Sequence, residues 1–265
     1  MILPLRVRKI FFSFAPAWPH NCRVAIDLGA FLNALGILLG AMFGLAQRAP
    51  LSLRTQLFFR NGIAAFNFVF GIRLVYLSIG GTFTSCLKQS FIALAAVILG
   101  FWAGKLFRFQ KMSNYLGRLA GNAIVAAQKN PSQKSSDGFN ACAILFCAAP
   151  LGIIGAIADG LSGYFYLLAV KAVMDALAMS GFVRLFRWPS ALSAIPVFIF
   201  FSAVSMAVQY YIKPFISTPE LDSVNVAAGL LTCIITIVIF EIRKVELANY
   251  LPALAIAPLL TKWFG

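Results

Sequence analysis

Acidic residues and histidine are scarce in this chain. Its 265 residues contain 8 Asp plus Glu and a single histidine, His20. The sequence has no HExxH, GxSxG or GxxxxGK[ST] motif, which excludes the common zinc-protease, serine-hydrolase and P-loop sites. The five cysteines show neither CxxC nor Cys/His spacing and lie mostly in apolar runs. We therefore expect no enzymatic site, cofactor, metal ion or disulfide.

Charge of either sign is also rare. Charged residues make up 11% of the chain and apolar residues 61%, and the mean hydropathy is +0.87. No ordinary soluble domain of this length has such a composition. The predicted fold class is all-α, a polytopic transmembrane helix bundle of about 7–8 spans in a lipid bilayer.

Basic residues dominate the few charges that are present. The 22 Lys plus Arg give a net charge of +14 and cluster in the gaps between apolar runs, near residues 48–60, 105–134, 184–187 and 243–244. The positive-inside rule explains this pattern, so we expect no nucleic-acid partner. The same rule places these linkers on the cytoplasmic side and both termini outside. The basic residues among the first 23 positions argue for the opposite orientation.

The sequence divides into a basic N-terminal extension, residues 1–23, and a single membrane domain, residues 24–265. The extension has a short apolar run broken by Pro16 and Pro19, which is too short to cross about 30 Å of hydrocarbon. We expect that it either lies on the membrane surface or reflects a translation start assigned too far upstream. The polar stretch at 105–137 ends in a segment rich in serine and lysine, which predicts a helix extension followed by a mobile cytoplasmic loop, placed at about 109–137.

Apolar stretches locate the spans. The stretch at 138–186 is long enough for two passes and is expected to turn near residues 159–163. Proline cannot donate a backbone hydrogen bond, so helix breaks are expected at Pro150, Pro196, Pro252 and Pro258. The other spans are predicted at residues 24–46, 61–80, 90–107, 191–212, 225–240 and 247–264.

Small residues recur at helical spacing in two of these spans. Such faces let another backbone approach closely, either within the chain or across a homodimer. The packing residues are Gly29, Gly36, Gly40 and Gly44 in the first span and Gly100 and Gly104 in the third. The pieces at 37–48 and 97–108 look alike, which suggests either an internal repeat or ordinary small-residue packing.

Polar residues inside the spans are the candidates for a functional site, because a bilayer makes them costly. Lys171 and Asp175 are four residues apart, so they share one face of a helix and can form an ion pair. Asp159 lies near the expected turn. Asn33 is the one amide on the glycine face of the first span, and it either bonds to another helix or lines a polar cavity.

Three stretches, in this order, resemble domain-of-unknown-function family 554, a family of bacterial inner-membrane proteins. They are DLGAFLNALGILLGAMFG near the start, GFNACAILFCAAPLGIIGAIADGLSG with AVKAVMDALAMSGF in the middle, and NYLPAL near the end. The resemblance covers about residues 26–260. The positions matching the polar motif residues of the family are Asn33, Asp159 with Gly160, Lys171 with Asp175, and Asn249 with Pro252. It implies a multi-span inner-membrane fold and no established reaction or substrate.

Two classes of function fit these residues. In a secondary transporter or channel-like protein for a small solute or ion, Asp159 and Asp175 would bind a cation or a proton. Lys171 would be the internal counter-ion, and Asn33 and Asn249 would be uncharged ligands. The alternative is a non-transporting membrane scaffold or assembly component, in which the Lys171–Asp175 pair is a structural clasp.

Overall fold

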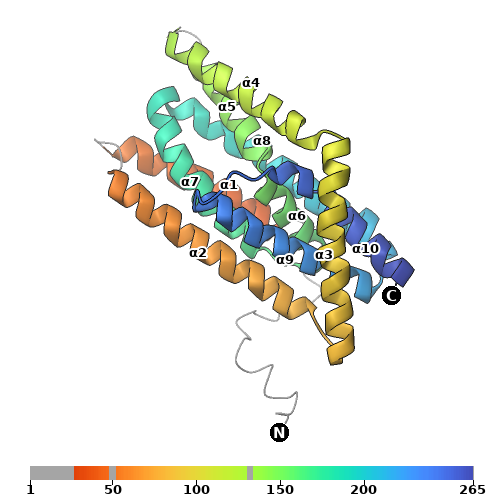
Figure 1. Cartoon of the computed structure of the whole chain (residues 1–265). Coiled ribbons are helices and arrows are strands. Elements are labelled where there is room, and N and C mark those ends of the chain that lie inside the picture. Colours follow the sequence, from red (N-terminus) through yellow and green to blue (C-terminus); the bar gives the residue numbers. More distant parts are fainter. Residues whose placement is uncertain (1–26, 48–51, 130–133, 265) are drawn as a thin grey trace.

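The computed structural model describes residues 27–47, 52–129 and 134–264, and all the regular structure in these ranges is helical (Figure 1). The long helices are α1 (Leu28–Ala46), α2 (Leu53–Ser78), α3 (Phe83–Leu106), α4 (Phe109–Lys129), α5 (Lys134–Cys147), α6 (Pro150–Ser162), α7 (Tyr166–Phe186), α8 (Ala194–Ala207), α9 (Thr218–Ile239) and α10 (Ala253–Phe264). Short segments flank α8 and precede α10: η2 (Trp188–Ser193), η3 (Val208–Ile212), η4 (Lys213–Phe215) and η5 (Leu247–Tyr250). The predicted all-α bundle is confirmed. The N-terminal extension lies outside the described residues.

Six helical segments of the described chain are long and apolar enough to cross a membrane, and α5 with α6 would make a seventh if this bent pair is one span. The two helices meet at an angle of 57°. The last predicted span, 247–264, is shorter than expected, because α10 has only 12 residues, about 18 Å of helix. The described chain therefore has six or seven candidate spans.

Two of the four prolines mark helix breaks. Pro150 is the first residue of α6, and Pro252 separates η5 from α10. Pro196 and Pro258 lie inside α8 and α10, so the prediction of breaks there was wrong. Pro196 falls in the first turn of α8, where a missing N–H costs little. The predicted turn near 159–163 is present, since α6 ends at Ser162 and Gly163 follows with a φ of 69°.

Helices α1 and α7 run in parallel and pack closely (Figure 1). Along their contact, Gly36 faces Ala172, Gly40 faces Ala176 and Gly44 faces Ser180. A Cβ atom at any of these glycines would overlap the backbone of α7. The predicted close-packing face is therefore real, and its partner is α7 of the same chain.

Two further pairs of helices in the bundle are antiparallel. Helix α2 packs on α9, where the Asn67 amide donates to the Thr232 carbonyl and the Thr236 hydroxyl, both at 3.0 Å. Helix α3 packs on α10 and η5, with Gly100 against Ala253 and Gly104 against Asn249. The similar glycine pieces of α1 and α3 thus serve two different contacts, one parallel and one antiparallel, as ordinary small-residue packing allows.

The contacts also fix which linkers share one side of the bundle. The Arg184 guanidinium of α7 donates to the Gly44 and Gln47 carbonyls at 3.2 and 3.0 Å, so α1 and α7 end together. Arg60 near the start of α2 pairs with Glu241 just after α9. Helix α3 ends beside η5. The linkers with most of the basic residues therefore lie on the same side, as their sequence pattern predicted.

Residues 109–129 form a helix, so the prediction of a loop over 109–137 was wrong for most of its length. Helix α4 is amphipathic and forms a hairpin with α5 (Figure 1). Its polar composition concealed a helical period, in which Phe109, Met112 and Leu116 share one face.

Candidate functional site

The Lys171–Asp175 ion pair lies inside α7, the helix that contributes to both apolar cores of the bundle. The Lys171 ammonium donates to the Asp175 carboxylate, and the side chains are only 2% and 9% exposed. A lone charge at this position would be expensive, and the pairing offsets most of that cost. The i,i+4 spacing predicted this pair, and the structure confirms it.

Asn33 of α1 stands beside this pair and is fully buried. Its side-chain amide interacts with the Asp175 carboxyl, while the amide oxygen has no hydrogen-bond partner within the described chain. Buried amide oxygens normally accept a hydrogen bond, and an exception requires an explanation. Asn33 therefore offers an unused acceptor next to the ion pair.

Two aromatic rings and a glycine complete the surroundings of the pair. The Lys171 Nζ atom lies 5.8 Å from the ring centroid of Phe146 on α5 and 5.4 Å from that of Phe201 on α8. A Cβ at Gly152 would overlap the Lys171 Cε and the Phe201 ring, so Gly152 leaves room for the lysine side chain. Phe146 and Gly152 flank the break between α5 and α6. The charged pair thus lies against a discontinuous helix.

An apolar pocket of about 350 Å³ lies on the other side of this break, beneath α4. Met112 and Leu116 of α4 line it together with Cys147 and Pro150 at the break and Phe200 of α8. Cys147 lies near enough to Lys171 and Asp175 to interact electrostatically with both. Residues of the α5–α6 break therefore contribute to both the pocket and the surroundings of the buried pair.

Asp159 and Asn249 form hydrogen bonds with other parts of the bundle. The Asp159 carboxylate accepts from the Gly29 backbone N–H at 3.2 Å, which satisfies a donor in the first turn of α1. Asn249 accepts from the Gln110 N–H at 3.0 Å and donates to Glu246 at 2.7 Å, so it joins η5 to the start of α4. Of the five predicted site residues, the structure brings together Asn33, Lys171 and Asp175.

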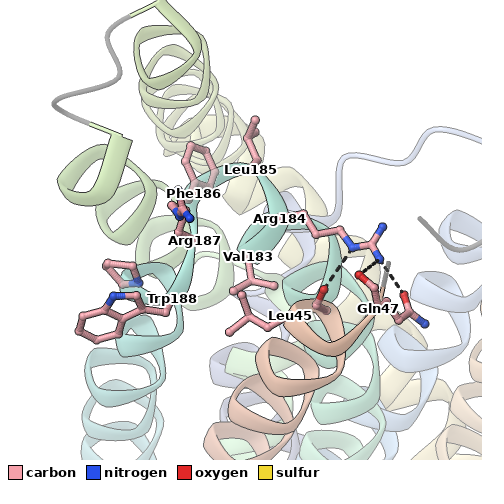
Figure 2. A pocket seen from close by; sticks show the side chains of 10 residues that line it. Leu45, Gln47, Val183, Arg184, Leu185, Phe186, Arg187 and Trp188 are labelled. Carbon is pink, nitrogen blue, oxygen red and sulfur yellow. Dashed lines mark hydrogen bonds between the residues drawn. The ribbon is translucent and has the colours of Figure 1, made fainter. Parts of the chain in front are cut away.

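A larger pocket, about 680 Å³, lies elsewhere, at the ends of α1 and α7 (Figure 2). Arg184 points away from the other labelled side chains of α7 and holds the last carbonyls of α1. A cation that binds the carbonyl end of a helix stabilises that end, so Arg184 has a structural task. Size alone therefore does not make this pocket the better candidate site.

The family described as "Protein of unknown function (DUF554)" matches residues 28–262. The chain belongs to the DUF554 family. It is 28% identical over 240 residues to "Uncharacterized protein YqgA" of Escherichia coli (strain K12), which covers 89% of this chain and 97% of that protein. It is 23% identical over 125 residues to "Uncharacterized membrane protein YdfK" of Bacillus subtilis (strain 168), or 47% of this chain and 54% of the relative. No solved structure matches.

Sequence reasoning missed three site residues of this DUF554 chain, which are Phe146, Gly152 and Phe201. Each lies on a helix other than α7, and each is one of many similar residues in an apolar run. Pro150 was the available signal, because a break at that position draws attention to the residues on either side. Nothing in the sequence pairs Phe201 with Lys171.

Proposed function

We propose that this DUF554 member is a secondary transporter or channel-like protein that moves a small solute or ion across the membrane. The observation that carries the proposal is the buried Lys171–Asp175 pair beside a broken helix, with the unsatisfied Asn33 amide oxygen at the same place. Ionisable residues within spans commonly mark ion and substrate pathways, and discontinuous helices form the binding sites of many secondary transporters.

Asp175 is the coupling group in this proposal. Its carboxylate binds either Lys171 or the transported species, and it needs one positive partner at a time to remain buried. When a ligand occupies Asp175, the Lys171 ammonium swings away toward another acceptor or toward water. The site then alternates between two states in which the carboxylate is neutralised, so neither state leaves a buried unpaired anion.

The apolar pocket beneath α4 supplies the route to this site. The pocket is lined by Cys147 and Pro150 of the α5–α6 break, and Phe146 and Gly152 of the same break contact Lys171. A change in the 57° bend would open this break. Helix α4, amphipathic and packed mainly on α5, covers the pocket.

A structural clasp is the second candidate function, for a non-transporting scaffold or assembly component. The mutual satisfaction of Lys171 and Asp175 favours it, because a fully paired buried ion pair holds a helix in one register without needing a ligand. The unsatisfied amide oxygen of Asn33 favours transport, since a clasp gains nothing from it.

The proposed location is the bacterial inner membrane, where helical bundles are the usual spanning structure. The side of the bundle with the basic linkers would face the cytoplasm. We propose no catalytic reaction for this chain.

A thermal-shift screen of the purified protein tests the proposal. Wild type, Asp175→Asn and the control Asp222→Asn, a carboxyl on α9 outside the site, are compared against inorganic ions, amines, amino acids and organic acids. A ligand that binds the folded state raises the unfolding temperature. The transport proposal expects a ligand that stabilises wild type and the control but not Asp175→Asn. If nothing in the library stabilises wild type, the transport proposal is rejected in favour of the clasp.

A further inference from the structure

The geometry points to ammonium or a short primary alkylammonium ion as the ligand of the Asp175 site. The ion donates a hydrogen bond to the Asp175 carboxylate in place of the Lys171 ammonium and donates a second one to the Asn33 oxygen. This inference rests on the function proposed above and names the class of ligand that the same site recognises.

Lys171 already shows what the site accommodates. Its side chain is an alkylammonium tethered to α7, with the Nζ atom at Asp175 and within 6 Å of two phenylalanine ring centroids, at 5.8 and 5.4 Å. Aromatic faces attract cations through the ring quadrupole and are the usual surroundings of ammonium ligands. The room beside Gly152 holds the aliphatic part of the lysine. The same surroundings suit an untethered amine of similar length.

Asn33 distinguishes a free ammonium from the tethered one. An ammonium group has three donors, and the hydrogen bond of Lys171 to Asp175 uses one of them. The Asn33 Oδ1 atom is a buried acceptor beside Asp175 and has no hydrogen bond in the described part of the chain. An untethered ammonium can take a position between the carboxylate and this oxygen. It would satisfy an acceptor that Lys171, fixed to α7, leaves unused.

Charge balance sets the valence of the ligand. Asp175 supplies one negative charge, and the polar groups that act on it are Lys171 and Asn33. Once the Lys171 ammonium has moved to another acceptor or to water, a monovalent cation matches this charge, whereas a divalent ion would leave a buried positive charge without compensation. Among the described residues, no group of three or more His, Cys, Asp or Glu could hold a metal ion. A sodium ion would need several oxygen ligands, whereas the Lys171 ammonium that occupies this position lies near two aromatic rings.

Chemical rescue of Lys171→Ala tests the inference. The variant leaves Asp175 without its cation and opens the space of the lysine side chain. Its unfolding temperature is measured with increasing ammonium, methylammonium, ethylammonium or propylammonium, and ionic strength is held constant with tetraethylammonium. We expect a saturable rise of roughly 5 °C or more with a primary ammonium. The matched control, Lys171→Ala with Asp175→Leu, should show no such rise.

A second variant serves if Lys171→Ala does not fold. Asn33→Asp keeps the Lys171–Asp175 pair and adds a second carboxylate beside it, which Lys171 cannot neutralise as well. Its unfolding temperature should rise with primary ammonium ions at concentrations that leave wild type unchanged. If neither variant is stabilised by an ammonium ion, or if sodium stabilises them equally well, the inference is overturned.

Uptake of labelled methylammonium into proteoliposomes separates this inference from the transport proposal. Both are supported if wild type takes up the amine and Asp175→Leu does not. Rescue without uptake would keep the ammonium site and reject transport of this ligand. Transport of a different solute without rescue would keep the transporter and reject the ammonium site.

Discussion

Removing only one of the two charges of the Lys171–Asp175 pair should destabilise the protein far more than removing both charges. The two side chains are 2% and 9% exposed, so the remaining charge in Lys171→Met or Asp175→Asn has little access to water. Removing one partner of a buried pair costs about 3–5 kcal/mol, which corresponds to roughly 6–20 °C in the unfolding temperature of a chain of this size. The double substitution Lys171→Met with Asp175→Asn, which removes both charges, should cost far less than the two single changes together.

The assay is a double-substitution cycle measured by unfolding in one detergent, with the Arg60–Glu241 pair as the matched control. That pair is 31% and 70% exposed, so Arg60→Met and Glu241→Gln should each cost less than about 1 kcal/mol. The reasoning is refuted if Lys171→Met and Asp175→Asn cost no more than the surface substitutions. It is also refuted if the costs of the two buried changes simply add, since the two charges would then be independent.

Three further predictions concern packing, the Asp159 contact and topology. Gly40→Ala places a Cβ against the Ala176 backbone of α7 and should lower the free energy of unfolding by roughly 1–3 kcal/mol. The control Gly62→Ala, with open space around it, should be neutral or slightly stabilising. Equal unfolding temperatures of the two variants would contradict the α1–α7 contact. Asp159→Ala removes the acceptor for the Gly29 N–H and should lower the free energy of unfolding by about 0.5–2 kcal/mol. Transport or ligand binding should persist in the folded fraction. Loss of binding in a stable variant would show that Asp159 belongs to the functional site. Reporter fusions directly after α7 and α9 should report the cytoplasm and a fusion after α2 the opposite side; a reversed result would overturn the orientation.

The fold class and most helices could be predicted because the bilayer imposes one simple rule. A span must be long and apolar, and that property can be read directly from residues such as those of α1 and α9. The rule is weaker where helices are short or polar. Helix α4 was mistaken for a loop, and α10 for a full span, because their lengths depend on the neighbours they pack against rather than on composition.

Half of the candidate site could also be predicted. The Lys171–Asp175 pair is local, since residues four apart on a helix are neighbours whatever the rest of the chain does. Asn33, Asp159 and Asn249 each have a partner far away in the sequence. Asp159 contacts Gly29, 130 positions away, and Asn249 contacts Gln110, 139 positions away. No spacing rule links such residues.

The sequence by itself determined a helical membrane protein with a glycine face on α1 and an ion pair on α7, because hydropathy and helical period act within single segments. Only the tertiary structure decided that α1 packs in parallel on α7, which places the Asn33 amide beside Asp175. It also decided that the α5–α6 break and the Phe201 ring meet Lys171. These contacts join helices from distant parts of the chain. Which helices pack together depends on the whole bundle, because the packing must leave little empty space and no unpaired charge.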